Sequence, residues 1–548
     1  MRKIFADLLE EATPRMNDAM VNGMSMTRVP RMMEYVDSIF RSASKSFPPG
    51  LEYIGCKPCT PYEEYQEATK PHNNRRTYDI ARSDLFMCRF YLAYKGEELK
   101  PKYISLPFLR DGGILWLGGS PYHISPVLSD QVISVGFDSV FVRLLRDKLT
   151  FKRVHHTFIC DGKSEAVQIV WSRIYRNSSK SKVPITTRAE STVLHYLLCR
   201  YGFTETMRRL IGTGLIVGED LTEAEYPSDE WVICRSVGIP PKTYIGSVYT
   251  PSKINIAIPR SHWNNVTKSV MASFFYLVDH FPEHLTISSL ENKDWWIILL
   301  GHVVHSGNFS QAKLFNSMKE HFASIEDYVD GIISRKLHTA GYVVHDLYDL
   351  FELVVLNFNK WVVDNQNQLT SIYGRTLEID YYIMFDISSG IFRFMFNLNK
   401  VAARKELTKK DVEELLNTYI KPGAIYKLRS GNLAVSSVSY SGDNKYPKIS
   451  AIIAEQESRP GPKRGEHRRK IPDQTKRFHS SMLELGSFLY LPKSNPVAVA
   501  RLNPYTTVNP DHAVIEPRMD QALLKKIQSL IDIQVKTLPQ EILDTLPR

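Results

Sequence analysis

The sequence predicts an α+β chain made of several domains, and three observations lead to this fold class. The chain has 548 residues, which is enough for two to four domains with hydrophobic cores of their own. Its apolar fraction of 43% and charged fraction of 23% are typical of a soluble globular protein. Stretches with the two-residue alternation of strands are mixed with stretches whose apolar residues have helical spacing.

The charge of the chain points to an acidic partner. The formal net charge is +10 and the pI is about 9.0, which indicates nucleic acid first and a membrane surface second. Acidic residues at Asp7, Glu10 and Glu11 stand where a secretory signal would be apolar. The most apolar run, residues 295–304, is shorter than the roughly 20 residues that span a bilayer, so we expect a buried helix there. Six cysteines in so long a chain favour a reducing, cytoplasmic setting without disulfides.

The first half of the chain alternates between helix and strand signals. Residues 1–45 have helical spacing, and residues 103–125 have strand spacing, with tight-turn signals at 111–113 and at Gly118-Gly119. Residues 178–182 are typical of an exposed linker, and residues 191–211 are expected to form one helix.

The second half carries the clearest helix signals. Residues 341–363 and about 380–400 have an apolar stripe at helical spacing. Another helix opens with a capping box at Thr408 and Asp411 and stops at Pro422-Gly423. The apolar stripe of residues 518–535 predicts a last helix, which either packs on its own domain or docks a partner.

Potential metal ligands are scattered. Cys56 and Cys59 form a C-x-x-C pair, which is half of a zinc site, but a second closely spaced pair is missing nearby. We therefore interpret them as two loop thiols, with zinc as the alternative. Histidines near apolar stretches pack in a core more often than they bind a metal. Four histidines of this chain have such positions: His155, His156, His302 and His305.

A basic segment followed by strand-like residues is the main candidate for a binding site. Residues 459–477 contain eight lysines and arginines but only two acidic residues, Glu466 and Asp473. The prolines and glycines of this segment indicate a loop. A solvated loop is the plain alternative. Strand patterns follow at 488–491 and 497–502, so the loop is expected to be mounted on a sheet, which suits a phosphate backbone.

This stretch resembles the fork region of the second-largest (β) subunit of multisubunit RNA polymerases. Residues 467–470 correspond to that family's basic segment, and Pro496, Arg501, Pro504 and Thr507 match its H-P-T-H-Y-G-R-V-C-P-x-E-T-P-E-G motif in register. The glutamate, one glycine and the final P-E-G of the motif are replaced here.

Two further stretches resemble the same family, in the family's order. Residues 103–125 are similar to its N-terminal F-P-L-M-T-D-R-G-T-F-I-I-N-G-T-E-R-V hairpin, although residues 121–123 replace E-R-V, so the contact made by that arginine is in doubt. The family has a long helix, a G-N-(K/R)-R loop, a further helix and then a K-Y-S-L-x-T-G-N motif. Residues 341–432 have a similar order, with a helix, Tyr373-Gly374-Arg375, two helices and then Gly431-Asn432.

The resemblance implies an N-terminal β-subunit piece, as in the split RNA polymerases of giant, phiKZ-like bacteriophages, with protrusion, lobe and fork regions. It divides the chain into 1–180 and 336–458 (the two parts of a protrusion-like domain), 181–335 (lobe-like), 459–510 (fork-like) and 511–548 (a C-terminal interface helix). It implies partners in the β C-terminal part and the β′ parts, contacts with DNA and RNA, no membrane, and the cytoplasm of the infected bacterial host. Nine residues are expected to contact nucleic acid: Lys463, Arg464, Arg468, Arg469, Lys470, Lys476, Arg477, Arg501 and Arg375.

Motifs of catalysis are missing from the sequence. We find no phosphate-binding P-loop, no H-E-x-x-H, no G-x-S-x-G and no N-A-D-F-D-G-D cluster. The resemblance then implies that this chain carries no catalytic residue, metal or cofactor, and that Mg²⁺ is held by a partner subunit. Two alternatives remain open: a basic viral structural or assembly protein that binds nucleic acid, and an independent nuclease or deaminase with dispersed ligands.

Overall fold

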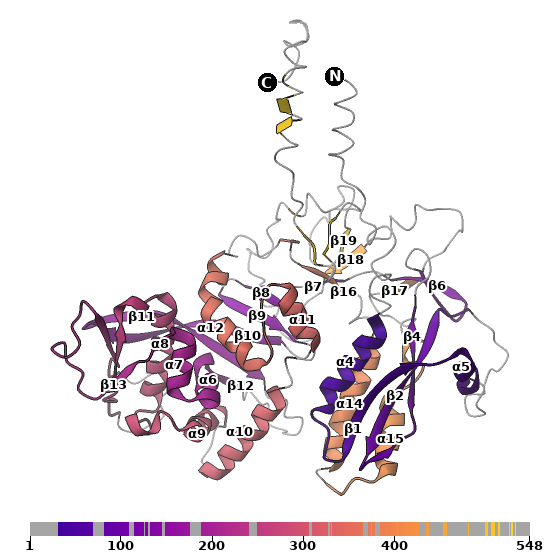
Figure 1. The fold of residues 1–548 in the computed structure, drawn as a ribbon, viewed down its shortest axis with the longest axis horizontal. Helices are drawn as coiled ribbons and strands as arrows, with labels where there is room; N and C mark the ends of the chain where they lie inside the picture. The colour runs from indigo at the N-terminus through magenta and orange to yellow at the C-terminus, as the bar shows by residue number, and fades with distance from the viewer. Residues whose placement is uncertain are drawn as a thin grey trace, which may run out of the picture. The chain divides into compact units, whose positions relative to one another are not determined.

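The chain folds into two compact units, which combine helices with sheets and confirm the predicted α+β class (Figure 1). Unit 1 consists of Met1–Ser129 and Thr370–Arg548, and unit 2 is the intervening segment Asp130–Leu369. The computed structural model describes residues 31–68, 82–108, 114–124, 127–129, 132–136, 138–144, 148–175, 188–239, 249–305, 309–326, 329, 331–364, 371–373, 375–378, 384–402, 404–426, 435–437, 453–456, 481, 499–501, 506–509, 513–515, 525–526, 528–529 and 532.

Unit 1 contains an antiparallel four-stranded sheet packed on helices. Its strands are β1 (Leu51–Pro58), β2 (Leu85–Tyr94), β3 (Glu97–Glu98) and β4 (Lys102–Pro107); β2 pairs with each of the other three. Helix α4 (Met32–Ser44) packs on β1 and beside α14 (Phe385–Ala402), which in turn packs on α15 (Lys409–Tyr419) (Figure 1). Segments about 300 residues apart in sequence therefore share one core. The short helix α5 (Pro61–Ala68) completes this part.

The helices of this core follow their apolar spacing. The buried face of α4 contains Met32, Val36 and Ile39, as the sequence predicts for the end of the 1–45 stretch, whose first 30 residues lie outside the described part. The capping box of α15 is also confirmed, because Thr408 and Asp411 bond each other's backbone N–H groups. The helix predicted at about 380–400 is α14.

A second, three-stranded sheet of unit 1 contains β5 (Ile114–Leu117), β6 (Ser120–Ile124) and β17 (Val435–Ser437). Gly118 and Gly119 join β5 to β6 with φ of 55° and 83°, which is a type I′ turn at the place where the sequence predicts a tight turn. The predicted turn at 111–113 lies outside the described residues, and the strands on either side of it, β4 and β5, belong to different sheets.

Unit 2 is built on an eight-stranded sheet. The strand order is β12-β11-β10-β14-β15-β13, with β9 paired to β10 and β8 to β9. The strands are β8 (Ile133–Val135), β9 (Ser139–Arg143), β10 (Lys148–Cys160), β11 (Lys163–Tyr175), β12 (Arg188–Thr192), β13 (Ile216–Gly218), β14 (Trp231–Arg235) and β15 (Asn255–Pro259). The long hairpin β10–β11 turns at Asp161-Gly162, both with positive φ (46° and 73°), which is again a type I′ turn.

Helices cover this sheet and enclose the core of unit 2. They are α6 (Val193–Tyr201), α7 (Phe203–Ile211), α8 (Asn265–His280), α9 (Lys293–Val304), α10 (Gln311–Glu326), α11 (Gly331–Thr339) and α12 (Leu347–Asp364), with 3₁₀ turns η4 (Arg260–His262) and η5 (Ile287–Ser289). Phe158 of β10 stacks on Phe275 of α8, with ring centroids 5.9 Å apart, and both rings are fully buried. Each such ring stabilises the fold by about 1.5–3 kcal/mol through burial.

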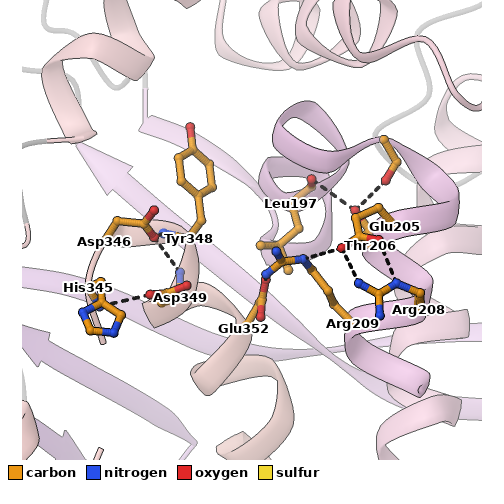
Figure 2. A network of polar contacts seen from close by, with 11 residues as sticks. Leu197, Glu205, Thr206, Arg208, Arg209, His345, Asp346, Tyr348, Asp349 and Glu352 are labelled. Atoms are coloured by element: carbon orange, nitrogen blue, oxygen red, sulfur yellow. Dashed lines mark hydrogen bonds and ion pairs between the residues drawn. The ribbon is translucent and has the colours of Figure 1, made fainter. Parts of the chain in front are cut away.

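Two helix predictions in unit 2 are wrong in their boundaries, for local reasons. The single helix predicted at 191–211 is broken at Gly202, whose φ of 82° and ψ of −177° are open only to glycine. The helix predicted at 341–363 begins at Leu347, because the Asp346 carboxylate accepts from the N–H groups of Tyr348 and Asp349 and caps the helix there (Figure 2).

The apolar run 295–304 is part of α9, with Trp296, Leu299 and Leu300 buried, as predicted for a core helix. Among the described residues, no helix combines the length and the apolar character that crossing a bilayer requires. The helix predicted at 518–535 falls mostly outside the described part, so it stays a prediction.

Candidate nucleic-acid interface

A small mixed sheet of unit 1 holds the described members of the predicted interface. It contains β7 (Val127–Ser129), β16 (Thr376–Glu378), β18 (Ile453–Gln456) and β19 (Val499–Arg501), in the order β16-β7-β18-β19 (Figure 1). β18 runs parallel to β7, and the other pairs are antiparallel. The sheet thus joins four segments that lie far apart in sequence, and three of them follow or belong to the stretches that resemble the polymerase family.

Arg501 and Arg375 lie at opposite corners of this sheet. Arg501 is paired with Ile453 at the end of β19, and Arg375 directly precedes β16 on the far edge. The strand pairings place the two residues about five residues apart along the strand direction and three strands apart across the sheet. This offset corresponds to about 20 Å between their backbones.

The backbone around Arg375 is firmly held. The N–H of Arg375 donates to the carbonyl oxygen of Ile372 (3.1 Å), and its own carbonyl oxygen accepts from the N–H of Val514 (2.8 Å). The Arg375 side chain is half-buried. The N–H of Ile372 donates to the Ser481 hydroxyl (2.9 Å), and both residues are buried. The turn at 371–375 is therefore tied to two later segments of the chain.

The other seven predicted contact residues lie outside the described part of the chain: Lys463, Arg464, Arg468, Arg469, Lys470, Lys476 and Arg477. The described residues on either side of them have defined places. β18 ends at Gln456 inside the sheet, and Ser481 is fully buried against Ile372. The described residues that flank the basic segment are thus Gln456, at the end of β18, and Ser481, beside the turn that carries Arg375.

A different arginine cluster, in unit 2, is fully engaged with carboxylates (Figure 2). Arg208 bonds both oxygens of Glu205 (2.8 Å each), and Arg209 links Glu205 (2.9 Å) to Glu352 (3.0 Å). The hydrogen bonds from Arg208 and Arg209 lower the pKa of Glu205 to about 2. Burial raises the pKa of Glu352 even though Arg209 opposes the shift. Because two carboxylates compensate two guanidinium groups, this cluster ties α7 to α12 and offers little charge to a phosphate.

Asp279 is a buried carboxylate at the centre of a half-buried polar cluster in unit 2, and the sequence did not single it out. Its side chain is 1% exposed, and its carboxylate lies 3.1 Å from His156 Nε2 and 3.3 Å from the Tyr249 hydroxyl, which donates to it. The Ser236 hydroxyl also donates to it. Serine and histidine bond the carboxylate and not each other, so no nucleophile–base pair is formed. We interpret the cluster as a tie between α8, β10 and the 236–249 region.

The cysteines and histidines considered as potential metal ligands lie in the described part of the chain, where no group of three or more His, Cys, Asp or Glu side chains could hold an ion. Burial raises the pKa of Cys56 and of Cys59 to about 11, which disfavours the thiolate that binds zinc. His305 bonds the Ser317 hydroxyl (2.9 Å). Asp279 could have been found from its position, since a carboxylate on an otherwise apolar helix such as 269–278 needs buried partners.

Comparison with known proteins gives one family. The family described as "Non-virion RNA polymerase subunit" matches this chain over residues 1–521. No curated protein matches the chain significantly.

Proposed function

From its membership of the non-virion RNA polymerase subunit family, we propose a specific place for this chain in the enzyme. It is the subunit that corresponds to the N-terminal half of the β subunit, in an RNA polymerase whose β subunit is divided into separate chains. As a family member, it is a subunit of a viral RNA polymerase and acts in transcription with other subunits. The proposal adds that it walls the DNA cleft and contacts template strand, non-template strand and RNA–DNA hybrid. Its further partners would be the β C-terminal part and the β′ parts, in the cytoplasm of the infected bacterial host.

The observation that carries the proposal is the connectivity of unit 1. Unit 1 is interrupted by unit 2, as the resemblance implies for a protrusion interrupted by a lobe, and unit 2 overlaps the predicted lobe-like region 181–335. The assignment of the individual regions stays a prediction. The small sheet joins β7, which follows the 103–125 stretch, and β16, which lies within the 341–432 stretch, to β19, which includes Arg501. This arrangement supports a basic loop mounted on an ordered base.

In the proposed role, this chain supplies position and charge while the chemistry occurs elsewhere. Arginine and lysine side chains between 463 and 477, with Arg375 and Arg501, would neutralise phosphates and hold the strands in register. Two Mg²⁺ ions held by a partner subunit would activate the attacking 3′ hydroxyl and stabilise the leaving pyrophosphate. Family membership favours this proposal over a basic structural or assembly protein, which would need no polymerase partner.

The test replaces three charges in the proposed loop within the assembled polymerase. In the variant R468Q/R469Q/K470Q, the slope of log K against log salt for DNA binding should become shallower by about 1 to 3, because each lost phosphate contact removes about 0.9 from it. The matched control K293Q/K313Q/K319Q removes three exposed lysines of unit 2 and should leave the slope unchanged. Equal slopes for both variants would contradict the assigned role of the loop.

A second experiment tests the assignment to the β subunit separately. Affinity purification of this chain from infected cells should bring down chains that carry the N-A-D-F-D-G-D cluster and the C-terminal β motifs. Purification of the chain alone, or as a homo-oligomer, would favour the assembly-protein alternative instead.

A further inference from the structure

Two cysteines of unit 2 lie directly opposite each other in the eight-stranded sheet. Cys160 is the last residue of β10 and is paired with Cys234 of β14. In the next pair, the Asp161 N–H donates to the Ile233 carbonyl oxygen (3.1 Å). Since hydrogen-bonded and non-hydrogen-bonded pairs alternate, Cys160 and Cys234 occupy a non-hydrogen-bonded pair, where Cα atoms are about 4.5 Å apart. That separation lies within the roughly 4.4–6.8 Å range of disulfides.

The two thiols are chemically unequal. They hydrogen bond to each other, and the bond from Cys234 lowers the pKa of Cys160, while burial raises the pKa of Cys234. The Lys268 ammonium also favours the Cys160 thiolate, and the carboxylates of Asp161 and Glu165 oppose it. Cys160 is 8% exposed beside a surface hairpin turn, and Cys234 is fully buried. Cys160 is thus the thiol that a small oxidant reaches first and the one that ionises more readily.

We propose that Cys160 and Cys234 form a peroxide-sensitive thiol pair that closes reversibly into a cross-strand disulfide between β10 and β14. In the first step, the Cys160 thiolate attacks hydrogen peroxide, an S–O bond forms as the O–O bond breaks, and hydroxide leaves and takes up a proton to become water. In the second step, the Cys234 sulfur attacks the sulfur of the Cys160 sulfenic acid, the S–S bond forms as the S–O bond breaks, and the leaving hydroxide takes the proton of Cys234 to become a second water. The sum is two thiols and one peroxide giving one disulfide and two waters.

The three cysteines of unit 1 provide a matched internal control. In β1 and β2, Cys56 is paired with Phe90 and Cys88 with Pro58, so neither cysteine lies directly opposite another one in the sheet. Burial raises the pKa of Cys56 and Cys59 to about 11 and that of Cys88 to about 12, which makes all three poor nucleophiles.

The experiment treats the full-length chain with increasing hydrogen peroxide, quenches with acid, and alkylates the remaining thiols after unfolding. Peptide mass spectrometry should show Cys160 and Cys234 losing alkylation together, joined in one peptide pair that has lost two hydrogens, at peroxide concentrations that leave Cys56 and Cys59 alkylated. Dithiothreitol should restore both thiols. Recovery of both as free thiols while Cys56 or Cys59 oxidises would overturn the proposal.

Two variants test the order of the steps. In C234S, Cys160 should stop at the sulfenic acid and react with dimedone, whereas in C160S, Cys234 should stay reduced. A disulfide that forms between Cys234 and any other cysteine in C160S would contradict the assigned pair. The wild-type peptide mapping does not depend on either variant folding, so it decides the matter alone if one of them does not.

Discussion

Acidification should destabilise unit 2 through one buried histidine, His195. This side chain is fully buried, with Nε2 3.1 Å from the Trp296 carbonyl oxygen and Nδ1 3.0 Å from the Ser191 hydroxyl. A carbonyl oxygen only accepts, so Nε2 carries the proton and Nδ1 accepts from Ser191. The ring is therefore neutral, and burial lowers its pKa to about 3.

The size of the effect follows from the difference between the folded and unfolded pKa. Below pH 6.5 the unfolded chain protonates His195 and the folded chain does not, so the stabilisation is complete above 6.5 and is lost as the pH falls toward the folded value of about 3. At pH 4.5, two pH units below the unfolded pKa, the loss is about 3 kcal/mol. This is a large part of the stability of a typical domain.

The assay is urea denaturation of the full chain followed by tryptophan fluorescence, at pH 7 and at pH 4.5. Six of the seven tryptophans lie between residues 130 and 369, so the signal reports mainly on unit 2. In H195Q, an amide can still donate to the Trp296 carbonyl but cannot titrate. Its loss of stability on acidification should be about 3 kcal/mol smaller than that of the wild type.

The control is H155Q, because His155 is exposed on β10. The stability that this variant loses between pH 7 and pH 4.5 should equal the stability that the wild type loses. If H195Q loses as much stability as the wild type between pH 7 and 4.5, the neutral, buried state assigned to His195 is wrong.

Three further substitutions test other parts of the fold, each by the change in the free energy of unfolding in urea. G202A should cost about 1–3 kcal/mol because the backbone there is open only to glycine, whereas G212A, in an αL conformation with open space around it, should cost only about 1 kcal/mol. T408A removes the cap of α15 and should cost about 1 kcal/mol, while T418A, late in the same helix, should cost less than half of that. D279N should cost roughly 2–4 kcal/mol, since it leaves a half-buried histidine and two hydroxyl groups around a buried side chain with one fewer acceptor site, and a cost below 0.5 kcal/mol would refute the role of this cluster.

Local chemistry explains which parts of the fold could be predicted from sequence. The capping box at Thr408 and the turn at Gly118-Gly119 are specified within four residues, and both are found where expected. The break at Gly202 was missed because a glycine inside an apolar helical pattern is usually tolerated. The Asp161-Gly162 turn is also specified locally, because Asp-Gly between two strands is a strong hairpin signal.

Long-range pairing explains what could not be predicted. Nothing in residues 127–129 indicates that their strand pairs in parallel with 455–456, because three-residue strands carry no register signal of their own. Arg375 and Arg501 belong to two separate motifs, and only the strand order places them at the same sheet. The proposed contacts of residues 463–477 stay a prediction.

The small sheet also imposes an order of events on a chain that is folding while it is being synthesised. β7 ends at Ser129, and its neighbours β16 and β18 begin at Thr376 and Ile453, so β7 waits for roughly 250 residues of translation before its first partner strand is made, or about 12–50 s at ribosomal rates of about 5–20 residues per second. Unit 2 is continuous and emerges in between, so it can complete its core first. During that interval, unpaired strand edges of unit 1 are exposed in the nascent chain, and a slow or stalled ribosome would lengthen the period in which they can aggregate or be bound by chaperones.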